Sequence, residues 1–337
     1  MNASLRPVSG TTREIYPLLA EWVRDGGDSI VVRTSGSTGT PKDVTLSHAA
    51  VVASARASLE RLGGPGQWIS ALPPTAVGGL QVLVRSILAG QEPVIAEDHA
   101  SIPLAIEAMT GGRRYASFVP TQLFRLLASD EAAALAGLDA VLLGGAAAPA
   151  DLVRRADTLG IRIVRTYGMS ETAGGCVYDG VPLEGARMRI SSDGRVELAG
   201  PMLFDGYGDA RRVGEWFTTA DLGEITDGRL RIIGRADEIV VSGGVNVPLP
   251  AVTEAVRGVS GVVDVVVTGV PDDEWGTKVV AVVVGSAGLQ ELRDAVEAAG
   301  HPRSWAPRER VIVEALPLLP GGKLDRLAVK EIAARGA

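Results

Sequence analysis

Short apolar runs alternate with stretches of helical spacing along the first half of the chain. Runs typical of β-strands are followed, except for the last, by a stretch with apolar residues three or four positions apart, as in an amphipathic helix. The strand-like runs cover residues 30–32, 68–72, 93–96, 116–119, 141–143 and 162–166, and the helical stretches 15–23, 49–62, 80–88, 104–109, 121–128 and 150–159. This alternation predicts βαβ units and a largely parallel sheet.

The pattern changes near residue 186. Short runs at 188–190, 195–198, 216–218 and 229–233 are separated by turns such as Asp193-Gly194 and Asp227-Gly228, which are typical of β-hairpins. They predict a small antiparallel, barrel-like unit. After the polar segment 234–238, helical stretches at 250–256, 289–299 and 327–334 are mixed with strand-like runs at 262–270, 278–284 and 310–313. We therefore expect an α/β protein with a large domain at 1–236 and a smaller α+β domain at 237–337.

Composition narrows the class of protein. With 337 residues, 46% of them hydrophobic, the chain can form two packed domains. It contains no apolar run near the ~20 residues of a membrane span, and its first residues lack the apolar centre of a signal peptide. Its single cysteine, Cys176, fits a reducing compartment, so we expect a cytoplasmic protein. A net charge of −7 without a long basic run argues against nucleic acid as a partner.

The stretch 34–42 carries the strongest chemical signal. It is Thr34-Ser35-Gly36-Ser37-Thr38-Gly39-Thr40-Pro41-Lys42. Glycines let the backbone bend with its N–H groups inward, hydroxyls add donors, and the lysine adds positive charge, which together suit a polyphosphate. It is not a Walker A loop, because the lysine is separated from the second glycine and follows a proline. An ordinary surface loop is the alternative from this stretch alone.

Four later segments combine residue types that suit a nucleotide. Gly144-Gly145-Ala146-Ala147 follows an apolar run and leaves room for a flat ligand, and Tyr167-Gly168-Met169-Ser170-Glu171-Thr172 follows the next one. In the second segment the tyrosine could pack on a base and Glu171 could hold Mg²⁺. Asp221 could accept hydrogen bonds from ribose hydroxyls, and Pro320-Gly321-Gly322 predicts a loop tip that carries Lys323. Each segment also has an ordinary structural interpretation, such as a β-to-α turn, a helix N-terminal acid, an Asx-turn or a solvated lysine.

Together, in this order and spacing, these segments resemble the adenylate-forming superfamily of acyl- and aryl-CoA synthetases, firefly luciferases and peptide-synthetase adenylation domains. The resemblance extends from about residue 31 to residue 330. It implies two half-reactions at one site, in which an acid and Mg-ATP give acyl-AMP and pyrophosphate and coenzyme A then displaces AMP to form a thioester. It also implies a C-terminal domain that rotates between the half-reactions.

The resemblance further implies a role for each matching residue. Catalytic cations are Lys42 and Lys323, and the hinge is Asp237. The ATP site comprises Thr34, Ser35, Gly36, Ser37, Thr38 and Gly39 for the phosphates, Gly144, Gly145, Ala146 and Tyr167 for adenine, Asp221 and Arg235 for ribose, Glu171 for Mg²⁺, and the adjoining Gly168, Ser170 and Thr172. The acid would lie against Val77, Gly78, Gly79 and Met169, and coenzyme A against Ser242, Gly243 and Gly244.

Within this family, segments 72–80, 118–123 and 142–149 are most similar to the 2-succinylbenzoate–CoA ligases of menaquinone biosynthesis, in their short bacterial form. Two departures stand out. Only 33 residues precede Thr34, where most members carry well over a hundred, and Ala76 stands where many relatives have a histidine. The second carboxylate of such an acid would need a cation, and Arg85, Arg125 and Arg187 all stay open.

Three other functions remain compatible with the sequence. The chain could be a CoA ligase for another aryl or medium-chain acid, an adenylation enzyme that loads a carrier protein, or a nucleotide-binding protein without catalysis. Retention of Lys42, Glu171, Asp221 and Lys323 together argues against the last. The expected partners are therefore small molecules, namely an acid, ATP and coenzyme A, with a homodimer as a further possibility.

Overall fold

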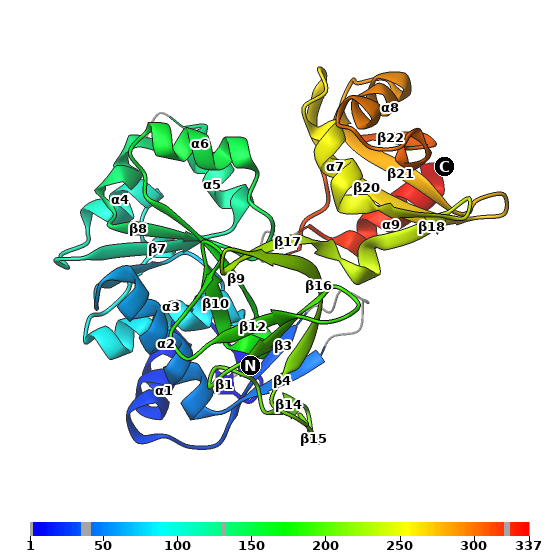
Figure 1. Ribbon diagram of the computed structural model, residues 1–337. Coiled ribbons are helices and arrows are strands. Elements are labelled where there is room, and N and C mark those ends of the chain that lie inside the picture. Colours follow the sequence, from blue (N-terminus) through cyan, green and yellow to red (C-terminus); the bar gives the residue numbers. More distant parts are fainter. Residues whose placement is uncertain (1–2, 35–41, 130–131, 320–323, 337) are drawn as a thin grey trace.

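The computed structural model describes residues 3–34, 42–129, 132–319 and 324–336, and it has a large N-terminal lobe and a smaller C-terminal lobe (Figure 1). The large lobe contains a seven-stranded sheet of order β11-β10-β9-β8-β7-β5-β6. Its strands are β5 (Gln67–Ser70), β6 (Val94–Ile95), β7 (Arg114–Phe118), β8 (Ala140–Leu143), β9 (Ile163–Met169), β10 (Gly174–Tyr178) and β11 (Val181–Pro182). Neighbours from β6 to β9 are parallel, as predicted. The series does not close at residue 166, because two antiparallel strands extend the sheet.

Helices cover both faces of this sheet (Figure 1). One face carries α2 (His48–Leu62) and α3 (Val77–Ala89), and the other carries α4 (Ile102–Glu107), α5 (Pro120–Leu127), α6 (Ala150–Thr158) and the short helix η2 (Ala132–Gly137). Successive side chains of a strand point to opposite faces. Trp68 and Tyr115 therefore pack beneath α2 and α3, whereas Ile69 and Ala116 pack beneath the other layer. Runs buried on both faces lose the polar alternation of an edge strand, which is why they could be recognised in the sequence.

The N-terminal segment packs against the first helical layer. It comprises β1 (Ser4–Leu5), β2 (Val8–Ser9) and α1 (Thr12–Asp25), and a further short helix, η1 (Ala96–Asp98), follows β6. A capping box between Thr11 and Glu14 begins α1, and Gly26, with φ +78°, ends it. Ile15 and Leu19 of α1 are fully buried against α3 and the strands beside it.

A second sheet, of order β15-β14-β4-β3, contains three strands that the pattern did not predict, β4, β14 and β15. Its strands are β3 (Ile30–Thr34), β4 (Lys42–Leu46), β14 (Gly206–Tyr207) and β15 (Ala210–Arg211). Val44 and Leu46 of β4 are buried while the residues between them are not, so the strand is half-buried with a period of two. The stretch 34–42 thus joins two antiparallel strands, with Thr34 paired to Lys42.

The antiparallel unit predicted after residue 186 is a four-stranded sheet of order β12-β13-β16-β17. The strands are β12 (Arg187–Ile190), β13 (Arg195–Ala199), β16 (Phe217–Thr226) and β17 (Arg229–Arg235). The turn between β16 and β17 has positive φ at Asp227 (+50°) and Gly228 (+73°), as a tight hairpin requires. Strand β16 is much longer than the predicted run at 216–218, so Asp221 lies inside a strand and not after one. There it pairs in register with Arg235.

The C-terminal lobe has its own core. A hairpin of β18 (Ile239–Ser242) and β19 (Val245–Pro248) leads into a sheet of β20 (Val262–Asp272), β21 (Gly276–Gly285) and β22 (Glu309–Val313). Helices α7 (Leu249–Arg257) and α8 (Leu289–Ala298) pack on one face and α9 (Arg326–Gly336) on the other, with the short helix η5 (Arg303–Trp305) before β22. The boundary proposed at 236/237 falls within η4 (Ala236–Glu238). In the described ranges, none of the helices has the length and apolarity to cross a membrane.

Candidate active site

The carboxyl ends of β8 and β9 bring two predicted nucleotide-binding segments side by side. The strands are parallel, with Leu143 paired to Arg165, so the residues that follow each strand lie next to each other. A Cβ atom on Gly144 would approach Thr166 Oγ1 to 2.2 Å, so only glycine fits there. Gly145 has φ +81°, and Gly145 and Ala146 are exposed beyond the strand end. This edge is where open α/β sheets bind ligands.

Tyr167, Asp221 and Arg235 form one hydrogen-bonded group, although they come from three separate strands. The Tyr167 hydroxyl donates to Asp221 Oδ2 at 2.8 Å, and Arg235 Nη1 donates to Oδ1 at 3.2 Å. Asp221 is buried, with 8% of its surface exposed. Burial and the nearby Asp221 charge raise the pKa of Tyr167, so its hydroxyl stays a neutral donor. The predicted ribose-binding carboxylate is thus oriented by one hydroxyl and one guanidinium.

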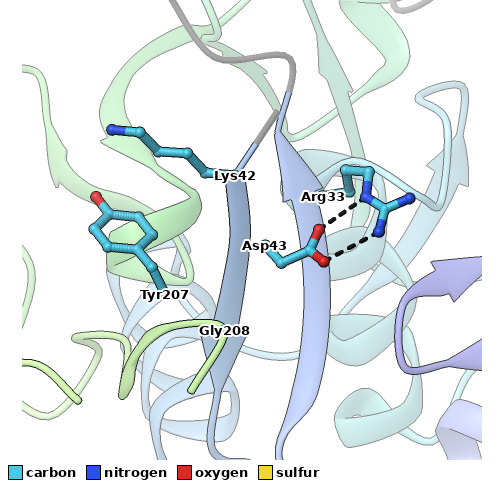
Figure 2. A pocket seen from close by; sticks show the side chains of 5 residues that line it. All are labelled: Arg33, Lys42, Asp43, Tyr207 and Gly208. Atoms are coloured by element: carbon cyan, nitrogen blue, oxygen red, sulfur yellow. Dashed lines mark hydrogen bonds and ion pairs between the residues drawn. The ribbon is translucent and has the colours of Figure 1, made fainter. Parts of the chain in front are cut away.

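A second group joins Lys42 and Glu171 through Tyr207, a residue that the sequence did not indicate. The Tyr207 hydroxyl donates to Glu171 Oε1 at 2.8 Å, and Lys42 Nζ lies 5.1 Å from the centre of the Tyr207 ring. An open pocket is lined by Arg33, Lys42, Asp43, Tyr207 and Gly208 (Figure 2). In the sequence, the only feature that marks Tyr207 is its place between two glycines, Gly206 and Gly208, in a stretch without a strand pattern. Its partners lie too far away along the chain for a sequence pattern to reveal them.

The two groups lie at opposite ends of one short segment. Tyr167 is half-buried near the end of β9, and Glu171 lies in the short helix η3 (Ser170–Thr172) directly after that strand. Four residues can separate their Cα atoms by at most about 14 Å. Such a spacing suits a ligand that carries a sugar at one end and phosphates at the other.

The remaining residues of this segment shape its turn. A Cβ atom on Gly168 would meet Gly174 O at 2.1 Å, so glycine permits the close pairing of β9 and β10. Thr172 is fully buried; its Oγ1 accepts from the Met169 N–H at 2.9 Å and donates to Gly174 O at 2.7 Å. Ser170 is half-buried in the same turn. These contacts fix the direction in which Glu171 projects.

Glu171 has the chemistry of a magnesium ligand. Mg²⁺ takes oxygen ligands and is usually held by one or two carboxylates together with phosphate oxygens and water. No group of three or more His, Cys, Asp or Glu side chains that could hold a metal occurs among the residues that the structure describes. The single carboxylate therefore fits an ion that a polyphosphate brings with it, and does not fit a metal bound by protein alone.

Some predicted residues lie outside the described part of the chain. These are Ser35, Gly36, Ser37, Thr38, Gly39 and Lys323. The structure describes the residues on either side of the two segments that contain them. Thr34 Oγ1 donates to Lys42 O at 3.3 Å across the start of the first segment, and an isolated bridge joins Leu318 to Leu324 on either side of the second.

The predicted acid-binding residues Val77, Gly78 and Gly79 form the first turn of α3. A Cβ atom on Gly79 would meet Pro73 O at 2.1 Å, so the helix begins in close contact with the preceding backbone. The residue before the helix, Ala76, provides no side-chain cap for the first N–H groups. Met169, the fourth predicted residue, ends β9.

The three arginines considered for a second carboxylate have different surroundings. Arg125 is exposed on α5, and Arg187 forms an exposed ion pair with Glu215. Arg85 is buried on α3, where its Nε donates to the Gln81 carbonyl at 2.8 Å, and burial lowers its pKa. Among described residues, Arg85 has no carboxylate within ion-pair distance.

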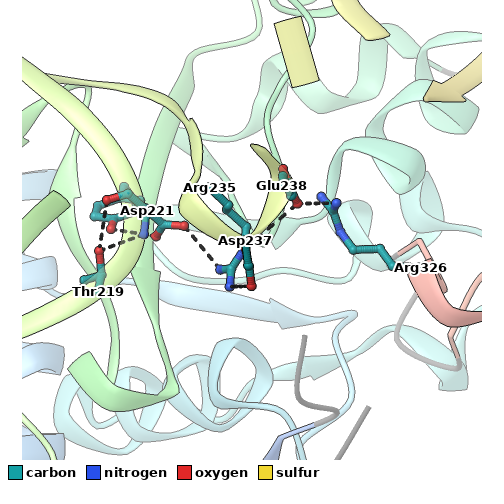
Figure 3. Close-up of polar contacts among 7 residues, drawn as sticks. Thr219, Asp221, Arg235, Asp237, Glu238 and Arg326 are labelled. Atoms are coloured by element: carbon teal, nitrogen blue, oxygen red, sulfur yellow. Dashed lines mark hydrogen bonds and ion pairs between the residues drawn. The ribbon is translucent and has the colours of Figure 1, made fainter. Parts of the chain in front are cut away.

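The predicted hinge residue connects the two lobes electrostatically (Figure 3). Asp237 accepts from both Nε and Nη2 of Arg235, each at 2.8 Å. The next residue, Glu238, is buried, forms an ion pair with Arg326 at the start of α9, and lies 4.0 Å from Arg235 Nε. Charged contacts thus run without a break from Asp221 in the large lobe to the first turn of α9, three residues after Lys323.

The residues predicted to face coenzyme A form the tip of the β18–β19 hairpin. Gly243 (φ +57°) and Gly244 (φ +80°) make the tight turn, and the Gly243 N–H donates to Trp275 O at 3.0 Å. A Cβ atom on Gly243 would meet the Trp275 ring at 2.8 Å. Ser242, at the end of β18, is buried. This hairpin therefore lies against the turn between β20 and β21.

A seven-stranded α/β sheet with a candidate nucleotide site at its carboxyl edge, followed by a separate α+β lobe, is the arrangement expected of an adenylate-forming enzyme. The family described as AMP-binding enzyme matches residues 28–205, and the AMP-binding enzyme C-terminal domain matches residues 251–323. The chain belongs to the AMP-binding enzyme family.

Two relatives carry the same activity in their names. The chain is 45% identical over 325 residues to a Mycobacterium tuberculosis protein named "Probable 2-succinylbenzoate–CoA ligase", covering 90% of this chain and 84% of the relative. It is 31% identical over 354 residues to the 2-succinylbenzoate–CoA ligase of Listeria monocytogenes, covering 97% and 75%.

A solved structure agrees in the fold. The o-succinylbenzoate CoA synthetase (MenE) of Bacillus subtilis, in complex with the acyl-adenylate intermediate OSB-AMP, matches with a TM-score of 0.75 at 25% identity, over 89% of this chain and 68% of that one. The comparisons confirm the predicted superfamily, the α/β fold and the class of AMP-forming acid–thiol ligase.

Proposed function

We propose that the chain converts 2-succinylbenzoate, ATP and coenzyme A into 2-succinylbenzoyl-CoA, AMP and pyrophosphate, as a step of menaquinone biosynthesis. The observation that carries the proposal is the pairing of the Tyr167–Asp221–Arg235 group with the Lys42–Tyr207–Glu171 group at the ends of one segment. The first group suits a ribose and the second suits phosphates with their magnesium ion. The names of the relatives support the choice of acid.

In the first half-reaction, a carboxylate oxygen of the acid bonds to the α-phosphorus of ATP while the bond to the bridging oxygen breaks and pyrophosphate leaves. Positioning and charge stabilisation supply most of the catalysis in such a transfer. We assign Lys42 and residues 34–39 to the outer phosphates, Asp221 and Arg235 to the ribose, and Gly144 to Ala146 to the adenine. When bound, Mg²⁺ would neutralise phosphate charge, with Glu171 as its protein ligand.

Lys323 would offset the negative charge that develops between the acid and the α-phosphate. Arg326, three residues further on, is held by Glu238, which lies beside Arg235. The base of the segment with Lys323 is therefore linked to the residue that contacts the ribose-binding carboxylate. This arrangement supports delivery of Lys323 to the adenylation site.

In the second half-reaction, the coenzyme A sulfur bonds to the acyl carbon, the bond to the AMP oxygen breaks, and the thiol proton is lost to solvent. We propose that the C-terminal lobe turns about Asp237 before this step. Lys323 then leaves the site, and the hairpin tip of Ser242, Gly243 and Gly244 faces the incoming thiol.

Arg85 is our choice of cation for the second carboxylate of the acid. A buried charge without a counter-ion is costly, so a ligand carboxylate would relieve it. The guanidinium lies 4.0 Å from the centre of the Trp68 ring and donates to Ser58 Oγ at 3.1 Å. On the same face of the sheet, nearer its carboxyl edge, the buried hydroxyls of Ser70 and Ser117 have no partner among the described residues. These hydroxyls add polar groups between Arg85 and the ligand edge of the sheet.

Pyrophosphate release across a panel of acids tests the proposed substrate. We expect kcat/KM for 2-succinylbenzoate to exceed that for benzoate and for medium-chain fatty acids by at least about 10²-fold, because those acids lack the second carboxylate. Arg85→Lys should reduce this ratio of kcat/KM values by raising KM for 2-succinylbenzoate alone, whereas Arg125→Lys should leave the ratio unchanged. A panel in which benzoate or a fatty acid is preferred would overturn the substrate, and failure of free coenzyme A to accept the acyl group would indicate a carrier protein instead.

A further inference from the structure

Tyr207 contacts both predicted functional groups at the phosphate end, although no sequence motif indicated it. Its hydroxyl donates to Glu171 Oε1 at 2.8 Å, and its ring lies 5.1 Å from Lys42 Nζ. A cation at this distance from an aromatic ring is attracted to the ring face. One side chain therefore contacts the Glu171 carboxylate through its hydroxyl and the Lys42 ammonium group through its ring. Figure 2 shows the side chains of Tyr207 and Lys42 next to each other.

The surroundings of Tyr207 fix its position. Its backbone pairs with Val44 of β4, so its side chain lies diagonally across from Lys42, two residues earlier on the same strand. Its ring packs on Phe204 with 4.9 Å between ring centres. The Phe204 N–H donates to Glu171 O at 2.9 Å, so the segment that carries Tyr207 also holds η3 in place.

The Tyr207 hydroxyl is the donor in its contact with Glu171, because an ionised carboxylate only accepts hydrogen bonds. It occupies one lone pair of Glu171 Oε1 and leaves Oε2 available to a metal ion. A carboxylate held in this way loses less rotational freedom when it binds the ion.

We propose that Tyr207 is a positioning residue for the metal and phosphate end of the site. Its hydroxyl orients Glu171 toward Mg²⁺, and its ring holds Lys42 toward the phosphates. The inference rests on the proposed function, because it takes Glu171 as the magnesium ligand and Lys42 as the phosphate-binding cation. The inference adds Tyr207 as a residue that contacts both Glu171 and Lys42. Loss of its hydroxyl should therefore affect metal binding, and loss of its ring should also affect phosphate binding.

Metal binding measured without turnover tests the inference. The probe is Mn²⁺, followed by electron paramagnetic resonance, with the enzyme and saturating α,β-methylene-ATP, which cannot release pyrophosphate. We expect Tyr207→Phe to weaken Mn²⁺ binding by about tenfold, as for other partners of metal ligands. Affinity for the analogue without metal should stay within twofold, because the ring beneath Lys42 remains. Tyr207→Leu should also weaken metal-free binding by about threefold, through loss of the cation–ring contact.

A double-mutant cycle separates positioning from general damage. If the hydroxyl acts through Glu171, Tyr207→Phe should change Mn²⁺ affinity less than twofold in a Glu171→Gln background. Tyr16→Phe is the matched control, because Tyr16 on α1 is also half-buried against the same core cluster. Thermal unfolding of Tyr207→Phe should stay close to the wild-type curve.

The outcomes distinguish this inference from the function beneath it. Unchanged Mn²⁺ affinity in Tyr207→Phe, or an equal loss with and without Glu171, would overturn the role of Tyr207 and leave the proposed ligase intact. Wild-type protein that binds neither the analogue nor Mn²⁺ would instead overturn the proposed function.

Discussion

At the scale of single residues, the site depends on side chains that hold one another before any ligand is present. Asp221 is the clearest case, because both of its carboxylate oxygens are engaged by donors from other strands. A carboxylate fixed in this way needs little reorganisation when it accepts hydrogen bonds from a ribose. Arg235 shares its guanidinium between Asp221 and Asp237, so the nucleotide end and the lobe boundary share one charged group.

Asp221→Asn should weaken binding of AMP by about 10- to 100-fold, since hydrogen bonds to a charged acceptor contribute roughly 1.5–3 kcal/mol. Calorimetric titration with AMP measures the effect. Asp227→Asn is the control: it makes the same chemical change at the exposed turn of the same hairpin, where asparagine tolerates positive φ. AMP affinity within twofold of wild type in Asp221→Asn would contradict its assignment to the ribose.

At the scale of elements, backbone contact determines where α3 begins. Gly78 and Gly79 look alike in the sequence, but an added methyl group meets only a flexible Leu72 side-chain end, at 3.3 Å, from the first and the Pro73 carbonyl, at 2.1 Å, from the second. Alanine favours a helix over glycine by about 1 kcal/mol. That gain is available at Gly78, whereas a backbone overlap costs more at Gly79.

Gly79→Ala should therefore destabilise the protein by about 1–3 kcal/mol and raise KM for the acid, as the first turn of α3 is displaced. Gly78→Ala should leave the free energy of unfolding unchanged or raise it slightly. Thermal unfolding of both variants, with steady-state kinetics on the acid, checks the pair. Equal melting temperatures for the two variants would show that the helix start is not constrained by Pro73.

Elements also show what the sequence could and could not predict. The parallel strands were predictable because strands covered on both faces form continuous apolar runs. Strand β4 was missed because it has only two buried positions, Val44 and Leu46, and directly follows a stretch rich in glycine and hydroxyl residues. The candidate site residues Lys42 and Glu171 could be found from residue types near strand ends. Asp221 was found as one acid in a mostly neutral segment, although it lies inside β16. Tyr207 could not be found in this way, because it lies beside Lys42 only through the pairing of β14 with β4. The Asp221–Arg235 contact could not be predicted either, because the β16–β17 hairpin extends well beyond the apolar run at 216–218.

At the scale of the whole molecule, the two lobes meet through the charged residues around η4. Asp237 holds Arg235 on one side, and Glu238 holds Arg326 on the other. A rotation of the C-terminal lobe about Asp237 must rearrange the contacts of Arg235 with Asp237 and Glu238, because these contacts join residues on both sides of the proposed boundary. At the proposed hinge, electrostatic contacts and backbone torsions would therefore change together.

Asp237→Pro should affect the two half-reactions unequally, because proline fixes φ and restricts the preceding residue while the present arrangement can persist. We expect the slowdowns in pyrophosphate release and in transfer from preformed acyl-adenylate to coenzyme A to differ by at least about tenfold. Asp237→Ala removes the carboxylate and keeps the backbone free, so it isolates the loss of the Arg235 contact. Equal losses in both steps for Asp237→Pro would argue against a rotation about this residue.

The position of β14 beside β4 has a consequence for biosynthesis. While the nascent chain emerges from the ribosome, β4 can pair with β3 almost at once, but its other edge waits for Gly206 and Tyr207. Lys42 and Tyr207 are 165 positions apart (207 − 42), and at 5–20 residues per second translation needs roughly 10–30 s to cover that interval. Throughout it, β4 exposes unpaired backbone groups to neighbouring chains. Chaperone protection should therefore matter most for chains stalled short of residue 206.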